Sequence, residues 1–277
     1  MPKGPVAIAS FLMLLGSPLA AGEIVWQEDL GQALALARDL NRPVLVDFYA
    51  DWCAPCRKME RDFWPREDVT KLTTEKFVCV QLDFDRQRRL AARYRIKSIP
   101  AVLVLDPWGQ EIASRFGFGN NVARYLDVMK AVPESFADVA GWQAAVEADG
   151  ENVAALRSLG EAYFHMGLIA ASNKLYERAT RTRAAHQDRK LMSELHLAQA
   201  WGYLRDDDHL DALRTFQRAQ RNPRLERRDV ALFGLVVAST RLDDRSSAVR
   251  YLGKLESEFP GSPALDSARA QIAVTRH

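Results

Sequence analysis

Two cysteines separated by two residues constrain this 277-residue chain more than any other feature. Cys53 and Cys56 follow the apolar, β-branched run 44–49 and precede a run of helix-forming residues. The order predicts a strand, a short turn and a helix that carries Cys53 at its N-terminus. Unpaired N–H groups and the positive end of the helix dipole favour a thiolate there, and the thiolate is the reactive form. Pro55 suits the first helical turn, which needs no backbone N–H.

Half of a structural zinc site is the alternative interpretation of this cysteine pair, because a closed zinc site needs about four ligands. The chain has one further cysteine, Cys79, and five histidines, which all lie far along the sequence: His165, His186, His196, His209 and His277. No second ligand pair lies near the first. The spacing therefore favours a dithiol that closes a disulfide within the motif, and we predict no metal site.

Residues 46–58, Val-Asp-Phe-Tyr-Ala-Asp-Trp-Cys-Ala-Pro-Cys-Arg-Lys, resemble the active-site segment of thioredoxins. The continuation, with Met-Glu, Phe-Trp and Asp-Val pairs between residues 59 and 69, resembles the C-terminal thioredoxin domain of the transmembrane reductase DsbD and its soluble relatives. A second matching motif is Ile99-Pro100 ahead of an apolar run. The resemblance covers about residues 24–132. It implies an α/β thioredoxin fold, with a central mixed sheet flanked by helices, over residues 23–132.

Thiol–disulfide exchange supplies the expected chemistry. Cys53 attacks a substrate disulfide, and Cys56 then attacks Cys53 and releases the reduced substrate. We therefore expect Cys53 to be exposed with a lowered pKa and Cys56 to be shielded. The sequence contains no nucleotide-binding motif and we predict no cofactor, so electrons would arrive by thiol exchange, for example from a DsbD-type membrane reductase.

The thioredoxin resemblance also implies roles for residues around the motif. Asp47 matches the buried aspartate that takes the proton of the second cysteine through a water. Pro100 matches the cis-proline that faces the disulfide, and Ile99 would offer its backbone groups to a substrate strand. Trp52 would pack beside the cysteines and limit solvent. The Ala-Pro pair between the cysteines and a buried Asp47 resemble reducing members of the superfamily more than oxidising ones.

Two polar positions in predicted strands leave alternatives open. Asp47 interrupts a strand that is otherwise apolar on both faces, so a buried carboxylate there needs a partner or a raised pKa; an outward-facing residue is the simpler interpretation. Thioredoxins often place a lysine beside this aspartate, but Gln81 stands there in this chain. Cys79 is mid-strand, and we expect it to pack as a small hydrophobic residue rather than to react.

Residues 1–22 have the composition of a secretory signal peptide, with Lys3, an apolar run over 6–15 and small residues before Gly22. The apolar run is too short to span a bilayer comfortably, although an uncleaved anchor is the alternative. We therefore predict an exported, periplasmic protein that is soluble after cleavage. The 38 basic and 36 acidic side chains nearly balance, so no nucleic-acid partner is expected.

Helical periodicity rich in alanine replaces the strand patterns from residue 133, which predicts a second domain over residues 133–277. Leucine, small and aromatic residues match the tetratricopeptide pattern, namely Leu156, Leu159, Gly160, Tyr163, Gly167, Tyr176 and Ala179. A shift of forty residues maps Tyr176 onto Phe216, and a third, degenerate unit runs over 229–259. A single hairpin cannot bury its own apolar face, so we predict a stacked tetratricopeptide-like array. Helical packing without a ligand groove is the alternative.

Together these features predict an exported thiol:disulfide oxidoreductase that reduces protein disulfides, with the repeats holding a client or another peptide or protein partner. A chaperone-like protein is a second hypothesis, because the cytosolic chaperedoxins also join a thioredoxin domain to tetratricopeptide-like repeats. In that case the redox pair would be secondary to holding unfolded clients. A pure interaction scaffold is a third hypothesis, and the intact cysteine pair argues against it.

Overall fold

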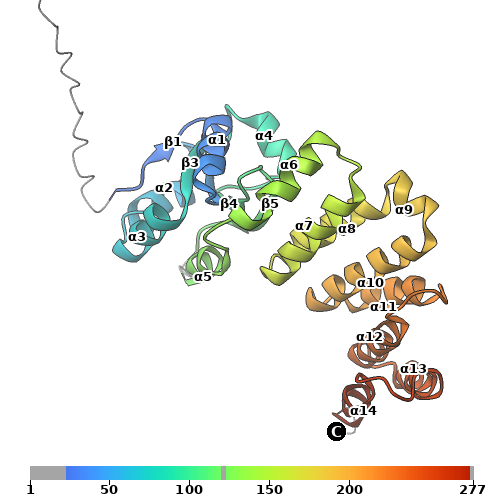
Figure 1. Cartoon of the computed structure of the whole chain (residues 1–277). Coiled ribbons are helices and arrows are strands. Elements are labelled where there is room, and N and C mark those ends of the chain that lie inside the picture. Colours follow the sequence, from blue (N-terminus) through green and yellow to red (C-terminus); the bar gives the residue numbers. More distant parts are fainter. Residues whose placement is uncertain (1–22, 120–122, 275–277) are drawn as a thin grey trace, which may run out of the picture.

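The computed structural model describes residues 23–119 and 123–274. The predicted signal peptide lies outside these residues. The described chain consists of a mixed sheet with flanking helices, followed by an array of helices that leads away from the sheet (Figure 1). Within the described ranges, no helix combines the length and the apolar character that a bilayer crossing would need.

The N-terminal part is built on a five-stranded sheet with the order β1-β3-β2-β4-β5. The strands are β1 (Trp26–Gln27), β2 (Val44–Tyr49), β3 (Val78–Asp83), β4 (Ala101–Leu105) and β5 (Glu111–Phe116). β3 runs parallel to β1 and β2, whereas β4 runs antiparallel to β2 and β5. The predicted mixed sheet is therefore present. Its central strands β2 and β4 are buried on both faces and are apolar apart from Asp47 and the half-buried Tyr49 at the end of β2, as strands covered by two layers of helices must be.

Helices cover both faces of the sheet: α1 (Leu30–Leu40), α2 (Ala54–Asp62), α3 (Glu67–Lys76), α4 (Arg88–Arg93) and α5 (Ala123–Ala131). Alternate residues of β2 face opposite cores, because the side-chain period of a strand is two. Val44, Val46 and Phe48 pack with α1 and α4. Leu45 packs in the opposite core with α2, α3 and α5. Asp47 has the same parity as Leu45, so its side chain points toward this second core.

The remainder of the described chain is helical: η1 (Ala137–Val139), α6 (Ala140–Ala148), α7 (Val153–His165), α8 (Ile169–Thr180), α9 (Arg183–Gln187), α10 (Arg189–Arg205), α11 (His209–Gln220), α12 (Arg228–Arg241), α13 (Arg245–Glu258) and α14 (Leu265–Val274). The pairs α7–α8, α10–α11 and α12–α13 are successive hairpins (Figure 1). Gly160 allows α7 and α8 to approach closely, because a Cβ there would lie 3.2 Å from the ring of Tyr176. The tetratricopeptide type of these hairpins stays a prediction.

Tyr163 of α7 joins the helical array to the sheet. Its hydroxyl donates a hydrogen bond of 2.6 Å to Oδ2 of Asp106, and both side chains are buried. Asp106 follows β4, and its Oδ1 accepts 2.9 Å hydrogen bonds from the backbone N–H groups of Trp108 and Gln110. The fully buried Phe136 belongs to the core of the first hairpin, against which Trp108 also packs. The predicted boundary after residue 132 is therefore covered by contacts between the two parts.

Replacing Tyr163 with Phe should lower the free energy of unfolding by about 1–3 kcal/mol, because a buried carboxylate loses the only side-chain donor that it has among the described residues. Urea unfolding followed by tryptophan fluorescence measures this loss. Tyr203→Phe is a matched control, because in the part of the chain that the structure describes that hydroxyl is hydrogen-bonded within its own helix, to Gln199. An equal effect of the two substitutions would contradict a special role for the contact between the two parts.

Candidate functional site

The cysteine pair lies where the sequence placed it, at the start of α2, with Cys53 before the helix and Cys56 in its first turn. Cys53 is the N-cap of α2, and the backbone N–H of Cys56 donates to Cys53 Sγ at 3.2 Å. Cys53 and Cys56 form a disulfide. An N–H group directed at a sulfur on a helix N-terminus stabilises negative charge there when the disulfide opens.

Both cysteines are buried in this disulfide form, with 3 % of Cys53 and 6 % of Cys56 exposed. The expectation that Cys53 is exposed is therefore wrong for this form. The reason is local packing, since Ala50, Tyr49 and Ile99 cover the pair. The turn also folds back on the strand end, because the Cys53 N–H donates to the carbonyl of Ala50 at 3.0 Å.

The segment that covers the disulfide comes from the start of β4. Pairing of β4 with β2 places Ala101 opposite Phe48, so the preceding Ile99 and Pro100 lie beside the cysteine turn. The Ile99–Pro100 peptide bond is cis, as expected. The Pro100 carbonyl accepts a 2.8 Å hydrogen bond from the N–H of Gly117. Among the backbone hydrogen bonds of the described residues, none involves the N–H or the carbonyl of Ile99.

Trp52 stands out from the surface beside the motif, with 65 % of its area exposed. Its Nε1 donates to Oδ2 of Asp85 at 2.6 Å, and Asp85 also pairs with Arg88. This contact ties the indole to the loop after β3. Ile99 and Tyr49 are the half-buried side chains that pack on the cysteines, and the role of Trp52 in limiting solvent stays a prediction.

Asp47 is buried, with 3 % of its area exposed, so the outward-facing alternative is wrong. Its Oδ2 accepts a 3.2 Å hydrogen bond from Nε2 of Gln81, which lies opposite it on β3. The same Nε2 donates to Oε2 of Glu60 at 3.1 Å. Oδ1 of Asp47 has no hydrogen-bond partner among the described residues.

Burial is the main reason why the pKa of Asp47 rises from 3.8 to about 7. The hydrogen bond from Gln81 lowers this pKa, and the nearby charge of Glu60 raises it. Trp64 lowers the pKa of Asp47 by a smaller amount than Gln81 does. Its buried Nε1 has no hydrogen-bond partner among the described residues. A carboxyl group with a pKa near 7 can both accept and release a proton at neutral pH.

Cys79 is a core residue, as expected. It is 5 % exposed on β3, and burial raises the pKa of its thiol to about 12. The protonated thiol is a poor nucleophile, so Cys79 does not belong to the reactive site. In the part of the chain that the structure describes, no group of three or more His, Cys, Asp or Glu side chains could hold a metal ion.

Two site residues were not assigned a role from the sequence. Glu60 follows Cys56 by four residues, a spacing that puts both on one face of α2. Gln81 was identified only as a replacement for lysine. The helix spacing was the available signal for Glu60, whereas the contact between Glu60 and Gln81 depends on how α2 packs on the sheet.

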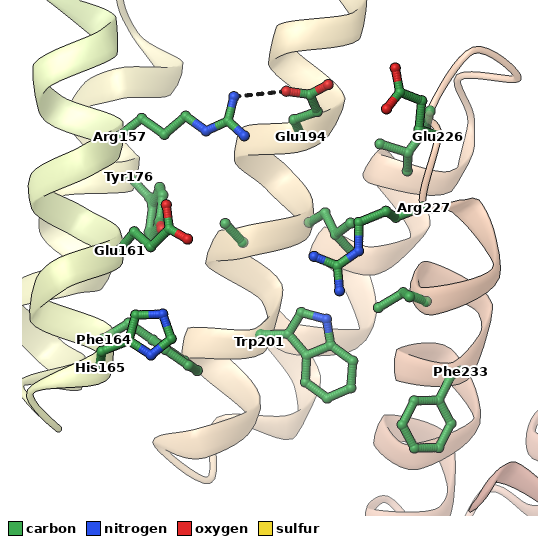
Figure 2. Close-up of a pocket in the computed structure, with 14 residues that line it drawn as sticks. Arg157, Glu161, Phe164, His165, Tyr176, Glu194, Trp201, Glu226, Arg227 and Phe233 are labelled. Carbon is green, nitrogen blue, oxygen red and sulfur yellow. Dashed lines mark hydrogen bonds and ion pairs between the residues drawn. The ribbon is translucent and has the colours of Figure 1, made fainter. Parts of the chain in front are cut away.

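The helical array carries a groove of about 630 Å³ between α7, α10 and α12. The residues that line it are Arg157, Glu161, Phe164, His165, Tyr176, Glu194, Leu197, Ala198, Trp201, Leu225, Glu226, Arg227, Val230 and Phe233. An ion pair of 2.8 Å joins Arg157 to Glu194 at one end (Figure 2). Arg227 extends from the opposite wall toward the space above Trp201 (Figure 2). No ion pair of Arg227 or Glu161 is formed within the described residues.

A family model described as thioredoxin-like matches residues 25–107. Over 110 residues the chain is 29 % identical to the thiol:disulfide interchange protein DsbD of Vibrio vulnificus, which covers 38 % of this chain and 17 % of that protein. Over 121 residues it is 33 % identical to a thiol:disulfide interchange protein TxlA homolog of Synechocystis, covering 41 % of this chain and 64 % of the relative. A solution structure of a Thermus thermophilus thioredoxin aligns with a TM-score of 0.36 and 27 % identity, covering 39 % of this chain and 85 % of that one.

Residues 25–107 therefore form a thioredoxin-like domain that is related to DsbD and to thioredoxins. The chain spans less than a fifth of the length of the DsbD relative. The helical region from residue 133 onward lies outside the family-model match.

Replacing Asp47 with Asn should stabilise the disulfide form above pH 8 by up to about 4 kcal/mol. The folded state holds the Asp47 proton more tightly than the unfolded chain does, so the contribution of this group to stability falls as the pH rises from 4 through 7. Asn carries no charge, which removes this loss, and the two proteins should differ little at pH 4. Urea unfolding at pH 4 and pH 9 measures the effect.

The exposed Asp39 on α1 provides a control, because Asp39→Asn removes a carboxylate without changing a buried charge. A stability difference for Asp47→Asn that does not grow between pH 4 and pH 9 would contradict a raised pKa of Asp47.

Proposed function

We propose that the protein is an exported thiol:disulfide oxidoreductase that reduces disulfides of other proteins. The observation that carries this proposal is the backbone N–H of Cys56 directed at Sγ of the N-cap residue Cys53, beside the cis Ile99–Pro100 segment. The names of the relatives support the reaction class, and the predicted signal peptide supports export.

Cys53 is the proposed nucleophile because its sulfur lies on the helix N-terminus. Its thiolate attacks one sulfur of the substrate disulfide, forms a mixed disulfide and expels the other substrate sulfur as a thiolate, which takes a proton from solvent. Cys56 then loses its proton and attacks Cys53 Sγ, which releases the second substrate thiol and closes the Cys53–Cys56 disulfide. The substrate gains two electrons, and the dithiol loses two.

Asp47 is the proposed acceptor of the Cys56 proton, acting through a water. Its pKa of about 7 suits this role, because the carboxylate form accepts the proton and the acid form returns it when the enzyme is reduced again. A thiol donor must reduce the disulfide after each turnover. A DsbD-type membrane reductase is the donor class that we propose, given the similarity to DsbD.

Ile99 is the proposed docking point for the substrate chain. Its N–H and carbonyl make no backbone hydrogen bond among the described residues, so they can pair with an extended segment next to the disulfide. The exposed Trp52 would form one border of this surface, and Pro100 holds the segment through its bond to Gly117.

Insulin reduction in the presence of a small dithiol tests the proposal. The full-length protein should accelerate insulin precipitation, and Cys53→Ser should abolish the acceleration because it removes the attacking sulfur. Cys56→Ala should instead accumulate a mixed disulfide on Cys53, which non-reducing electrophoresis detects. Cys79→Ala is the matched control and should retain activity. Insulin reduction by the Cys53→Ser variant at the normal rate would refute the assignment.

We also propose that the groove of the helical array recruits the partner that Cys53 reduces. The occupant that fits is an extended peptide segment with an apolar side chain beside an acidic one. Trp201 and Phe233, with ring centroids 5.8 Å apart, offer an apolar floor. The guanidinium of Arg227 beside this floor complements the acidic side chain. Tethering of this kind raises the effective concentration of the client at Cys53 without new chemistry.

Arg227→Glu should slow reduction of the protein trapped by the Cys56→Ala variant by about tenfold or more, because a repulsive charge replaces the proposed contact. Insulin reduction should be unchanged, since insulin uses only the cysteine site. Arg224→Glu removes an exposed arginine that does not line the groove and is the matched control. Equal rates of Arg227→Glu and wild type on the trapped protein would leave the array as a passive scaffold.

A further inference from the structure

Two buried polar atoms in the thioredoxin-like domain lack hydrogen-bond partners, and they are complementary. Oδ1 of Asp47 accepts hydrogen bonds when the carboxyl group is ionised, whereas Nε1 of Trp64 can only donate one. Neither atom has a partner among the described residues. Each side chain belongs to a residue that is 3 % exposed. Buried polar atoms nearly always have a partner, so this pair calls for an explanation.

The two atoms lie in the same core. Asp47 points from β2 into the core that holds Leu45 and Trp64, which follows α2. The indole N–H lowers the pKa of Asp47 as a hydrogen-bond donor does, so it lies near the carboxyl group. It does not reach the geometry of a direct hydrogen bond. A donor and an acceptor that are close but not bonded are the usual setting for a bridging water.

Trp64 is held firmly on all sides. Its backbone N–H donates to the carbonyl of Met59 at 3.2 Å, and its carbonyl accepts from Oγ1 of Thr70 at 3.0 Å. Its ring packs edge-on against the rings of Phe63 and Trp26, with centroids 4.8 and 5.0 Å away. The indole N–H therefore keeps one direction and cannot turn to another partner.

Cys56 lies on the face of α2 that packs against Asp47. Glu60 follows Cys56 by four residues, so the two share one side of the helix. The amide of Gln81 donates to Glu60 and to Asp47, which fixes this side of α2 against β2 and β3. Trp64, at the end of the same helix, and Cys56, in its first turn, thus both lie near the carboxyl group.

We propose that Trp64 is a positioning residue for thiol exchange: its indole N–H holds and orients the water that passes the proton of Cys56 to Oδ1 of Asp47. This inference rests on the proposed function, in which Asp47 accepts that proton through a water. Because the indole only donates, it occupies one lone pair of the water and leaves both hydrogens free. One hydrogen points to Oδ1, and the second lone pair is open to the thiol of Cys56.

The proton step is balanced. The S–H bond of Cys56 breaks and its proton joins the water, while a proton of the water moves to Oδ1 of Asp47. Cys56 becomes a thiolate and Asp47 a neutral acid. The water and Trp64 are unchanged, and no group is oxidised or reduced in this step. Trp64 touches neither the sulfur atoms nor the substrate.

The other hydrogen-bond donor at this carboxyl group serves the opposite oxygen. Gln81 of β3 donates to Oδ2 of Asp47, so Oδ1 is left to Trp64. Glu60 of α2 is the nearby charge that raises the pKa of Asp47. As a carboxylate it offers no proton to Oδ1.

The remaining neighbours of Asp47 do not compete for Oδ1. Tyr125 of α5 is close enough for the charge of Asp47 to contribute to raising its pKa to about 12. Its hydroxyl donates to the carbonyl of Gly117 instead. On β4 the residue opposite Asp47 is the apolar Val102. Among the described residues, Trp64 is therefore the donor available to a water on Oδ1.

Stopped-flow reaction of the reduced full-length protein with dithiobis-nitrobenzoate tests the inference. Attack by Cys53 releases one coloured thiolate, and closure of the disulfide by Cys56 releases the second. Trp64→Phe keeps an aromatic ring and removes the N–H. It should slow the second release at neutral pH by about fivefold or more and leave the first unchanged, because only the second needs the proton of Cys56 removed.

The same substitution in an Asp47→Asn background separates positioning from packing. There Trp64→Phe should change the second release by less than about twofold, because the water no longer leads to a base. Trp26→Phe is the matched control, since it removes an indole N–H from the same aromatic cluster. It should leave both releases at the wild-type rate.

Two measurements on the disulfide form are independent of turnover. The titration midpoint of Asp47, followed by the ¹³Cγ shift of its carboxyl group, should rise by about half a pH unit in Trp64→Phe, because the ionised form loses support from a donor. A high-resolution crystal structure of the wild type should show a water within about 3.2 Å of both Nε1 of Trp64 and Oδ1 of Asp47.

An effect of Trp64→Phe that is equal with and without Asp47 would overturn the inference, because Trp64 would then be a packing residue. A direct hydrogen bond between Nε1 and Oδ1 in the crystal, or an unchanged midpoint, would overturn it as well. A protein that fails to reduce insulin but shows the water and the shifted midpoint would contradict the proposed function and keep the link between Trp64 and Asp47. An active protein without them would contradict the inference alone.

Discussion

Burial of β2 on both faces is the constraint on which the rest of the thioredoxin-like domain depends. The strand lies between β3 and β4, and five of its six residues are buried. Its alternation sends Asp47 toward the core of α2, α3 and α5, and its end delivers the cysteine turn to the edge of the sheet. The same pairing with β4 brings Ile99 against the disulfide. A shift of register in this one strand would separate all of these groups.

Two buried aspartates, Asp47 and Asp106, differ in how many hydrogen bonds their carboxylates accept. Asp106 accepts hydrogen bonds from two backbone N–H groups of the turn after β4 and from the hydroxyl of Tyr163 on α7. Its carboxylate therefore connects the sheet to the helices. Asp47 accepts one hydrogen bond, from Gln81, and its Oδ1 has no partner among the described residues. Burial raises the pKa of both. The sparsely bonded carboxylate, Asp47, is the one that we propose to accept the proton of Cys56.

The helical array is not an independent appendage. Phe136 belongs to the core of the first hairpin, and Trp108 after β4 packs against that core. Tyr163 of the same hairpin is hydrogen-bonded to Asp106 after β4. One wall of the groove, α7, is therefore the helix that is bonded to the thioredoxin-like domain. A partner held in that groove would be kept near the thioredoxin-like domain, which raises its local concentration there.

Local rules predicted the strands, the cysteine-capped helix and the helical second half, because each depends on residues close in sequence, whereas the cis bond before Pro100 was predicted from the resemblance to thioredoxins. The expected exposure of Cys53 does not hold for the disulfide form, since Ala50 and Tyr49 from the strand end and Ile99, forty-six residues away, pack with it. The repeat spacing predicted stacked hairpins with a face that holds a partner, but not which residues line the groove, because that depends on three separate helices packing side by side.

By itself the sequence determined the reactive chemistry, because two sulfurs at a helix N-terminus need only local geometry to form a disulfide and a thiolate. The tertiary structure decided how that chemistry is controlled. Glu60 and Gln81 come from separate elements and influence Asp47 only because α2 packs across β2 and β3. Electrostatic coupling between carboxylates depends on distance and burial, and both of these are set by packing rather than by spacing along the chain.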